Sequence, residues 1–209
     1  MKKLGGFFLG WMVVAAAVAE TPIYQNNFES AALDQVPADF LVLDGGFAVK
    51  QSDGNKYLEL PGAPLDNFGL LFGPTTNAGV CVRARIEATA KGRRVPSFGV
   101  GLNGPSGYKL KVAPAKNALE LYKGDDLLAS APYAWKSGVW TMLRLRVHPA
   151  GPGIWRVEGR AWPQPEAEPE AWTISADEKT EPHAGRAALW GSPYSGTPIR
   201  FDDLSLTAE

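Results

Sequence analysis

Three acidic residues spaced by two, Glu166, Glu168 and Glu170, come nearest in this sequence to a catalytic carboxylate set. Glycoside hydrolysis needs two carboxyl groups flanking the bond, about 5–5.5 Å apart for retention and about 6.5–9.5 Å for inversion. Alternate acids on a strand would point to one side and supply such a pair. However, Pro169 interrupts the set, and residues 163–172 are too proline-rich for a sheet interior. We therefore predict a solvated acidic loop and assign no catalytic residue.

Aromatic residues in two turn regions are candidates for sugar contact. They are Tyr133 with Trp135, and Trp190 with Tyr194. The apolar faces of pyranose rings stack on indole and phenol rings, and the polar ends of these side chains remain able to hydrogen-bond. The competing role for each of them is packing in the core or between loops. We take these four residues as the predicted carbohydrate-binding set.

Nucleophilic and zinc chemistry find little support in the sequence. The chain has one cysteine, Cys81, and two histidines, His148 and His183, far apart in sequence. Zinc sites need closely spaced Cys and His ligands, and a serine hydrolase of the common type needs a Gly-x-Ser-x-Gly elbow, which is not visible. We expect Cys81 to pack beside a strand and both histidines to lie at the surface.

Alternating apolar and polar residues run through the chain and predict strands. Val139, Thr141, Leu143, Leu145 and Val147 alternate with residues that suit a solvent-facing side. Such a period of two indicates antiparallel sheets with one buried face. Similar patterns predict further strands at 24–29, 47–51, 56–60, 68–72, 80–88, 96–102, 108–112, 118–123, 126–131, 154–162, 186–190 and 199–207.

Turn residues separate these strands at short intervals, which is typical of a sandwich or barrel. Clusters such as Asp53-Gly54-Asn55 and Asn103-Gly104-Pro105 mark the turns. No Ser/Gly linker divides the chain, so we predict a single domain over residues 20–209. Two tandem immunoglobulin-like modules are the alternative.

The last predicted strand contains a register break. Ile199 and Phe201 place odd positions inward, whereas Leu204 and Leu206 place even positions inward. One extra residue must therefore lie at Asp202-Asp203, which predicts a β-bulge that redirects carboxylates.

Those carboxylates suggest a metal site. If the first and last strands are neighbours, Asn27, Glu29, Asp202 and Asp203 supply oxygen ligands of the kind that Ca²⁺ prefers. In the alternative, Asp202 caps backbone N–H groups that the bulge leaves free. A possible structural calcium ion is the one cofactor that we predict.

The N-terminus has the three parts of a secretory signal. Lys2 and Lys3 precede the uncharged apolar stretch 4–18, and Ala17-Val18-Ala19 provides a small-x-small cleavage pattern. The stretch is shorter than the roughly 20 residues that span a bilayer. We predict a signal peptide over residues 1–19 and export to the periplasm or the medium, with no membrane span in the mature chain.

The charge of the chain argues against nucleic-acid partners. Lys2 and Lys3 leave with the signal peptide, so 21 basic residues become 19 against 22 acidic ones, and the formal charge changes from −1 to −3. The basic residues are also scattered. A nucleic-acid binder would show a clustered positive surface.

Several segments together resemble the concanavalin A-like lectin/glucanase superfamily in its laminin-G-like branch, over essentially the whole mature chain. They are the segments 27–30, 107–112, 119–123, 138–145, 185–190 and 199–204, the last of which reads aromatic-Asp-Asp-aliphatic. The resemblance implies an all-β, two-sheet antiparallel jelly-roll sandwich with its termini on neighbouring strands. It also implies a bias toward carbohydrate ligands and a structural calcium near the bulge. The 3-keto-disaccharide hydrolase-like proteins are a related family.

Three functions follow as expectations, because fold alone does not fix function. The first is an exported, non-catalytic carbohydrate-binding or adhesion module that recognises a glycan or a cell-surface polysaccharide. The second is a carbohydrate-active hydrolase, of the glycosidase or 3-keto-disaccharide hydrolase type. The third is a structural protein of a bacterial envelope that binds no small ligand.

Overall fold

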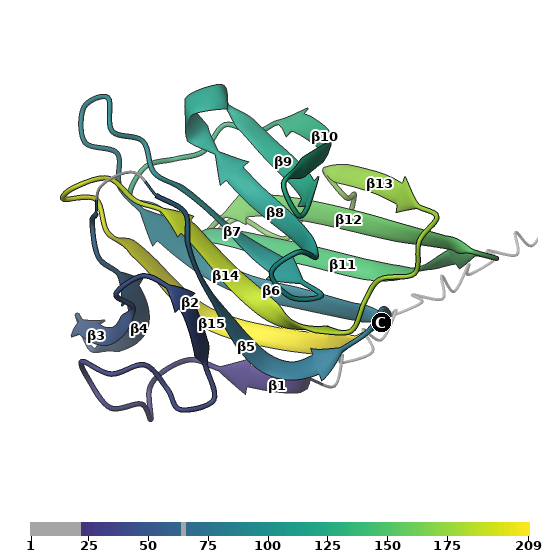
Figure 1. The fold of residues 1–209 in the computed structure, drawn as a ribbon. Coiled ribbons are helices and arrows are strands. Elements are labelled where there is room, and N and C mark those ends of the chain that lie inside the picture. Colours follow the sequence, from purple (N-terminus) through teal and green to yellow (C-terminus); the bar gives the residue numbers. More distant parts are fainter. Residues whose placement is uncertain (1–21, 64–65) are drawn as a thin grey trace, which may run out of the picture.

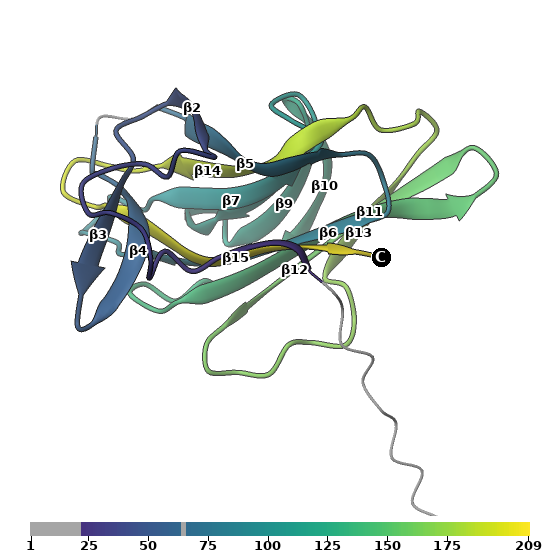
Figure 2. The same ribbon diagram turned by 90° about the horizontal axis from the view of Figure 1, so that it is seen from below.

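The computed structural model describes residues 22–63 and 66–209 as two packed antiparallel sheets (Figure 1). The predicted signal peptide, residues 1–19, lies outside the described residues. Within those residues no helix has the length and apolar character needed to cross a bilayer. Figure 2 shows the two sheets as layers, one above the other.

The first sheet, which we call sheet A, carries β1 along β15 and otherwise follows one path of neighbouring strands. In spatial order the path is β13 (Ile174–Glu178), β12 (Ile154–Pro163), β11 (Thr141–Gly151), β6 (Val80–Ala88), β15 (Ile199–Ala208), β4 (Asn55–Leu60) and β3 (Ala48–Ser52), and β1 spans Pro22–Asn26. The first and last described strands are therefore neighbours, as the resemblance implied.

The second sheet, sheet B, has seven strands. In spatial order they are β10 (Asp126–Pro132), β9 (Ala118–Lys123), β8 (Tyr108–Ala113), β7 (Ser97–Leu102), β14 (Gly185–Ser192), β5 (Phe68–Thr76) and β2 (Leu41–Asp44). A short 3₁₀ turn, η1 (Pro114–Lys116), joins β8 to β9. Each sheet combines strands from both halves of the chain, unlike two tandem modules.

The core lies between the sheets and follows the alternation in the sequence. Leu143, Leu145 and Val147 of β11 are fully buried, as are Val100 of β7 and Leu189 of β14. Alternate residues of the same strands therefore form the two outer faces of the sandwich. The all-β sandwich predicted from the periodicity is confirmed.

Two strands escaped the sequence prediction, and both lie at sheet edges. All four residues of β2 are exposed, so β2 carries no alternation to detect. β13 is short, and Ile174 is its one buried residue.

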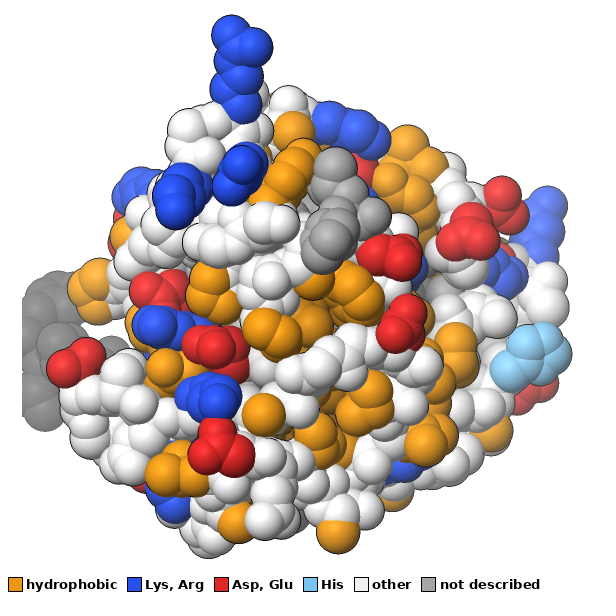
Figure 3. Space-filling view, turned by 60° about the vertical axis from the view of Figure 1, so that its left-hand side comes forward, with side chains coloured by type: hydrophobic (Ala, Val, Ile, Leu, Met, Phe, Trp, Pro, Cys, Tyr) orange, Lys and Arg blue, Asp and Glu red, His pale blue; other side chains and the backbone are white. Residues whose placement is uncertain are grey.

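Hydrophobic side chains gather on the side of the molecule that comes forward in Figure 3, the side on which β2 to β5 lie.

The predicted β-bulge is confirmed in β15. The pairing of β15 with β6 shifts register between Asp202 and Ser205, and Asp203 has a positive φ of 47°. The Asp203 backbone N–H donates a 2.7 Å hydrogen bond to Oδ1 of Asp202. The Asp202 carboxylate thus caps the irregular backbone, as one of the two sequence-based interpretations expected.

Candidate functional site

The outer face of sheet B brings together polar and aromatic side chains from four neighbouring strands. Trp190 on β14 pairs with Gly99 on β7. Gly99 pairs in turn with Lys111 on β8, and Lys111 pairs with Glu120 on β9. Because directly opposed residues of a sheet point to the same side, these side chains share one row. The next row places Lys109 opposite Tyr122.

These side chains surround a hollow that we call the Trp190 cleft. Its walls include Ser97, Lys109, Lys111, Tyr122, Trp190 and Ser192, and its cavity volume is about 110 Å³. A neighbouring hollow of about 160 Å³ shares Ser97, Lys111 and Ser192 with it and adds Glu120 and Tyr194. The two hollows together form a shallow groove across sheet B.

Glycine residues let the Trp190 indole lie flat on the sheet. A Cβ atom at Gly69 on β5 would come within 2.5 Å of the six-membered ring, and one at Gly101 on β7 within 3.0 Å of the indole nitrogen. Real Cβ contacts are not that short, so side chains at these positions would displace the ring. Trp190 therefore lies across a floor of glycines and is half-buried.

Two lysines of β8 point into the cleft. The Lys109 ammonium lies 4.2 Å from the centroid of the Trp190 ring, within the range of a cation–π contact. Burial lowers the pKa of Lys109 below its ordinary value, and burial does the same to the pKa of Lys111. Both ammonium groups therefore carry charge that water solvates only partly.

Glu120 is buried beside the lysines but has its own partners. Lys116 Nζ lies 2.7 Å from one carboxylate oxygen, and the Tyr122 hydroxyl donates a 2.7 Å hydrogen bond to the other. Burial acts to raise the pKa of Glu120, but the hydrogen bonds from Lys116 and Tyr122 outweigh it, so the pKa is lowered. Glu120 is therefore an ionised hydrogen-bond acceptor for Lys116 and Tyr122 and is not suited to donate a proton. Burial and the bond to Glu120 raise the pKa of Tyr122 to about 12.

The structure separates the four aromatic residues predicted for sugar contact. Trp190 and Tyr194 both line the groove on sheet B. Tyr133 and Trp135 instead pack against the core, and the Trp135 ring meets Phe98 edge-on with centroids 6.1 Å apart.

Sequence analysis missed Tyr122, Lys109, Lys111 and Glu120. The signal for them existed, because they occupy alternate positions of two consecutive strands and so share the outer face of sheet B. What the sequence lacked was the position of β14. It lies next to β7 in the sheet although more than 80 residues separate them in the chain, so it adds Trp190 to the row.

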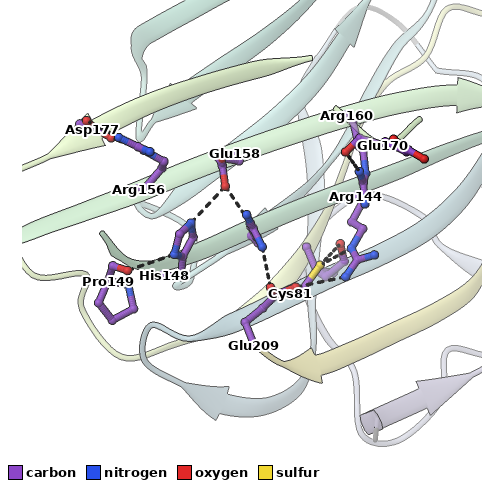
Figure 4. Close-up of polar contacts among 12 residues, drawn as sticks. Cys81, Arg144, His148, Pro149, Arg156, Glu158, Arg160, Glu170, Asp177 and Glu209 are labelled. Carbon is purple, nitrogen blue, oxygen red and sulfur yellow. Dashed lines mark hydrogen bonds and ion pairs between the residues drawn. The ribbon is translucent and has the colours of Figure 1, made fainter. Parts of the chain in front are cut away.

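The acidic segment 166–170 lies away from the Trp190 cleft and its carboxylates do not act as a set. Glu166 pairs with Lys136 at 2.9 Å, whereas Glu168 pairs with Arg144 and Arg160, which lie on the outer face of sheet A. Glu170 contributes its backbone carbonyl, which accepts a hydrogen bond from Arg160 at 2.9 Å (Figure 4).

Ion pairs cover the outer face of sheet A. Glu209 bridges Arg144 and Arg146, and Glu158 accepts a 2.7 Å hydrogen bond from Arg146 and lies 3.1 Å from His148 Nε2 (Figure 4). His148 is thus part of a salt-bridge network and His183 is exposed in a loop.

Cys81 on β6 is buried, with its Sγ 3.0 Å from Arg144 Nε (Figure 4). This position agrees with the expectation that the cysteine packs beside a strand.

The four residues predicted to bind calcium have other partners in this structure. Asp202 and Asp203 both face the guanidinium of Arg85, at 2.5 and 3.0 Å. Glu29 accepts a hydrogen bond from the backbone N–H of Lys56, and Asn27 accepts one from the backbone N–H of Glu29. Among residues 22–63 and 66–209 no group of three or more His, Cys, Asp or Glu side chains is placed to hold a metal ion.

Comparisons with known proteins give matches in structure and none in sequence. A scan against protein-family models finds no match, and neither does a search of curated protein sequences. The carbohydrate-binding module CBM66 from Bacillus subtilis is 11% identical with a TM-score of 0.56, and the alignment covers 81% of this chain and 96% of that one.

Two further domains are similar to the same degree. For the carbohydrate recognition domain of Emp46p the TM-score is 0.61 at 10% identity, over 91% of this chain and 98% of that one. For the lumenal domain of VIP36, in a form bound to Ca²⁺ and Man₃GlcNAc, the TM-score is 0.57 at 9% identity, over 84% and 85%. These likenesses show that the chain has the lectin-type, concanavalin-like sandwich fold.

Proposed function

We propose that this protein is an exported, non-catalytic carbohydrate-binding protein whose sugar contacts lie in the Trp190 cleft. The observation that carries the proposal is the Trp190 indole, which lies on the outer face of sheet B over Gly69 and Gly101, with polar side chains around it. A flat aromatic surface bordered by hydrogen-bonding groups suits the two sides of a sugar ring, one apolar and one polar. Structural neighbours that are carbohydrate-binding domains support the same class of ligand.

Export rests on the N-terminal pattern of residues 1–19, with the periplasm or the medium as the destination. The finer relation to laminin-G-like domains or to 3-keto-disaccharide hydrolase-like proteins stays a prediction. The structural calcium at Asn27, Glu29, Asp202 and Asp203 also stays a prediction. If it binds, the melting temperature rises when millimolar calcium is added.

A hydrolase remains the alternative and would need a protonated carboxyl group near the sugar. In the described part of the groove the lining carboxylates are Asp125, which is exposed, and Glu120, which its hydrogen bonds keep ionised. This arrangement favours binding over hydrolysis.

Removing the indole tests the proposal. A glycan array of residues 20–209 would first identify a bound glycan, and calorimetry would then compare wild type with Trp190→Ala. We expect the variant to lose tenfold or more in affinity, which corresponds to about 1.4 kcal/mol.

Trp172→Ala is the matched control. Its ring lies against Arg146 and Arg160 on the outer face of sheet A, so we expect it to keep full affinity. Equal affinities of wild type and Trp190→Ala would overturn the location of the site. Failure of the wild type to bind any glycan would favour a structural role instead.

A further inference from the structure

Resting on the function proposed above, we propose that the Trp190 cleft selects anionic saccharides, with Lys109 and Lys111 binding a carboxylate or sulfate group of the sugar. The two ammonium groups lie on the same face of β8, two residues apart, and both line the cleft with Trp190. The chemical class is therefore a pyranose that carries a negative substituent.

These two lysines differ from the other half-buried lysines of the described chain. Lys50 donates to Asp34, Lys56 to the carbonyl of Ala31, and Lys123 to Glu178. Lys109 and Lys111 have no hydrogen-bonded or ion-paired acceptor among residues 22–63 and 66–209, although Lys109 contacts the Trp190 ring. Partly desolvated cations without an acceptor are costly, and a bound anion would offset that cost.

Nearby carboxylates do not take the place of a ligand. Glu120 accepts hydrogen bonds from Lys116 and Tyr122 and forms none with Lys111, so it acts on Lys111 through space. The charge of Asp125 opposes the lowering of the Lys109 pKa by burial without reversing it, and Asp125 is exposed to solvent and forms no ion pair with Lys109. Screening by water weakens such an exposed charge. The cleft thus keeps an excess of positive charge in a chain whose formal net charge is −1.

The geometry also joins the cationic and aromatic parts of the site. Because the Lys109 ammonium lies over the Trp190 ring, 4.2 Å from its centroid, a sugar that contacts the indole meets the lysine as well. Charge-assisted hydrogen bonds are roughly twice as strong as neutral ones. We therefore expect the anionic group to set the preference among sugars and the indole to supply contact common to all of them.

The test measures binding of paired polymers that share a backbone, of which one member carries more negative charge. Polygalacturonate and its methyl-esterified form test for carboxylate, and chondroitin sulfate and desulfated chondroitin test for sulfate. We expect the wild type to bind one of the anionic forms at least tenfold more tightly than its less charged counterpart, with affinity falling as salt rises. The double variant Lys109→Met/Lys111→Met, which keeps the apolar stems, should lose that preference.

Lys179→Met is the control for loss of a lysine outside the cleft, because Lys179 is exposed between β13 and β14. It should retain the preference for the anionic form. If neutral glycans bind as tightly as anionic ones and still depend on Trp190, the inference about charge is wrong and the proposed function stands. If neither kind binds, both are wrong. Melting curves of each variant would show that it is folded.

Discussion

Tryptophan residues on the two outer faces show how neighbouring side chains determine what a residue can do. The Trp172 ring has three guanidinium groups against it, those of Arg160 at 4.2 Å, Arg146 at 4.5 Å and Arg144 at 5.8 Å. The Trp190 ring contacts one ammonium group, that of Lys109, and lines the cleft. The same side chain is therefore a packing element on sheet A and a candidate ligand contact on sheet B.

Arg85 pairs with both aspartates of the bulge, and its loss gives a prediction. The Asp202 carboxylate is 1% exposed and pairs with Arg85, and burial raises its pKa despite hydrogen bonds from Asn55 and Arg85. Arg85→Met leaves this carboxylate without its cation. Breaking a buried pair costs about 3–5 kcal/mol. In a protein of this size that lowers the melting temperature by roughly 6–20 °C.

The pH dependence of this loss follows from the raised pKa of Asp202. A carboxyl with a higher pKa in the folded than in the unfolded state binds its proton more tightly when folded. Folding therefore gains stability as the pH falls through that raised pKa, and the defect of Arg85→Met should be smaller near pH 4 than at pH 7. Melting temperatures of the wild type and Arg85→Met, measured by calorimetry at pH 4 and pH 7, check this difference. Arg83→Met, an exposed neighbour, is the control, and equal melting temperatures for the two variants would contradict the account.

At the scale of elements, the cleft depends on glycines in β5 and β7, at positions that pair with Trp190 of the neighbouring strand β14. Gly69 on β5 stands directly opposite Trp190 on β14, and Gly99 on β7 stands opposite it on the other side. In most strands glycine weakens packing, but it also marks places where another group approaches closely. At Gly69 the indole is the group that approaches, whereas at Gly99 it is the backbone carbonyl of Leu110.

Gly69→Ala should therefore impair binding without removing any residue that contacts the glycan. The added methyl group would come within 2.5 Å of the indole, so the ring must move off the sheet. We expect a loss of about tenfold in glycan affinity, measured by calorimetry. Gly151→Ala is the matched control, because nothing lies within 4 Å of the added Cβ. Unchanged affinity in Gly69→Ala would show that the ring orientation does not matter.

On the scale of the whole molecule, the two outer faces have different chemistry. The face of sheet A neutralises its own charges through bridges such as Glu209 to Arg144 and Arg146. The face of sheet B leaves two lysines and an indole directed into a cleft. The contrast supports the proposal that the binding surface lies on sheet B.

The sequence predicted the fold well because alternation and turn residues are local properties. The described strands other than the edge strands β2 and β13 follow from such patterns, and so does the bulge at Asp202-Asp203. The site was harder to predict, because it depends on which strands become neighbours. Trp190 and Lys109 meet only because β14 inserts between β5 and β7. Likewise, nothing local distinguishes Trp135, which meets Phe98, from Trp190.

The most direct test of the account observes the indole of Trp190 during a glycan titration. The chain has seven tryptophans, and Trp190→Phe would assign the indole N–H resonance of Trp190 in an NMR spectrum. We predict that a bound glycan shifts this resonance in a saturable way and leaves that of Trp172 in place. A glycan that binds and shifts the Trp172 resonance, but not that of Trp190, would contradict the assignment of the binding surface to sheet B.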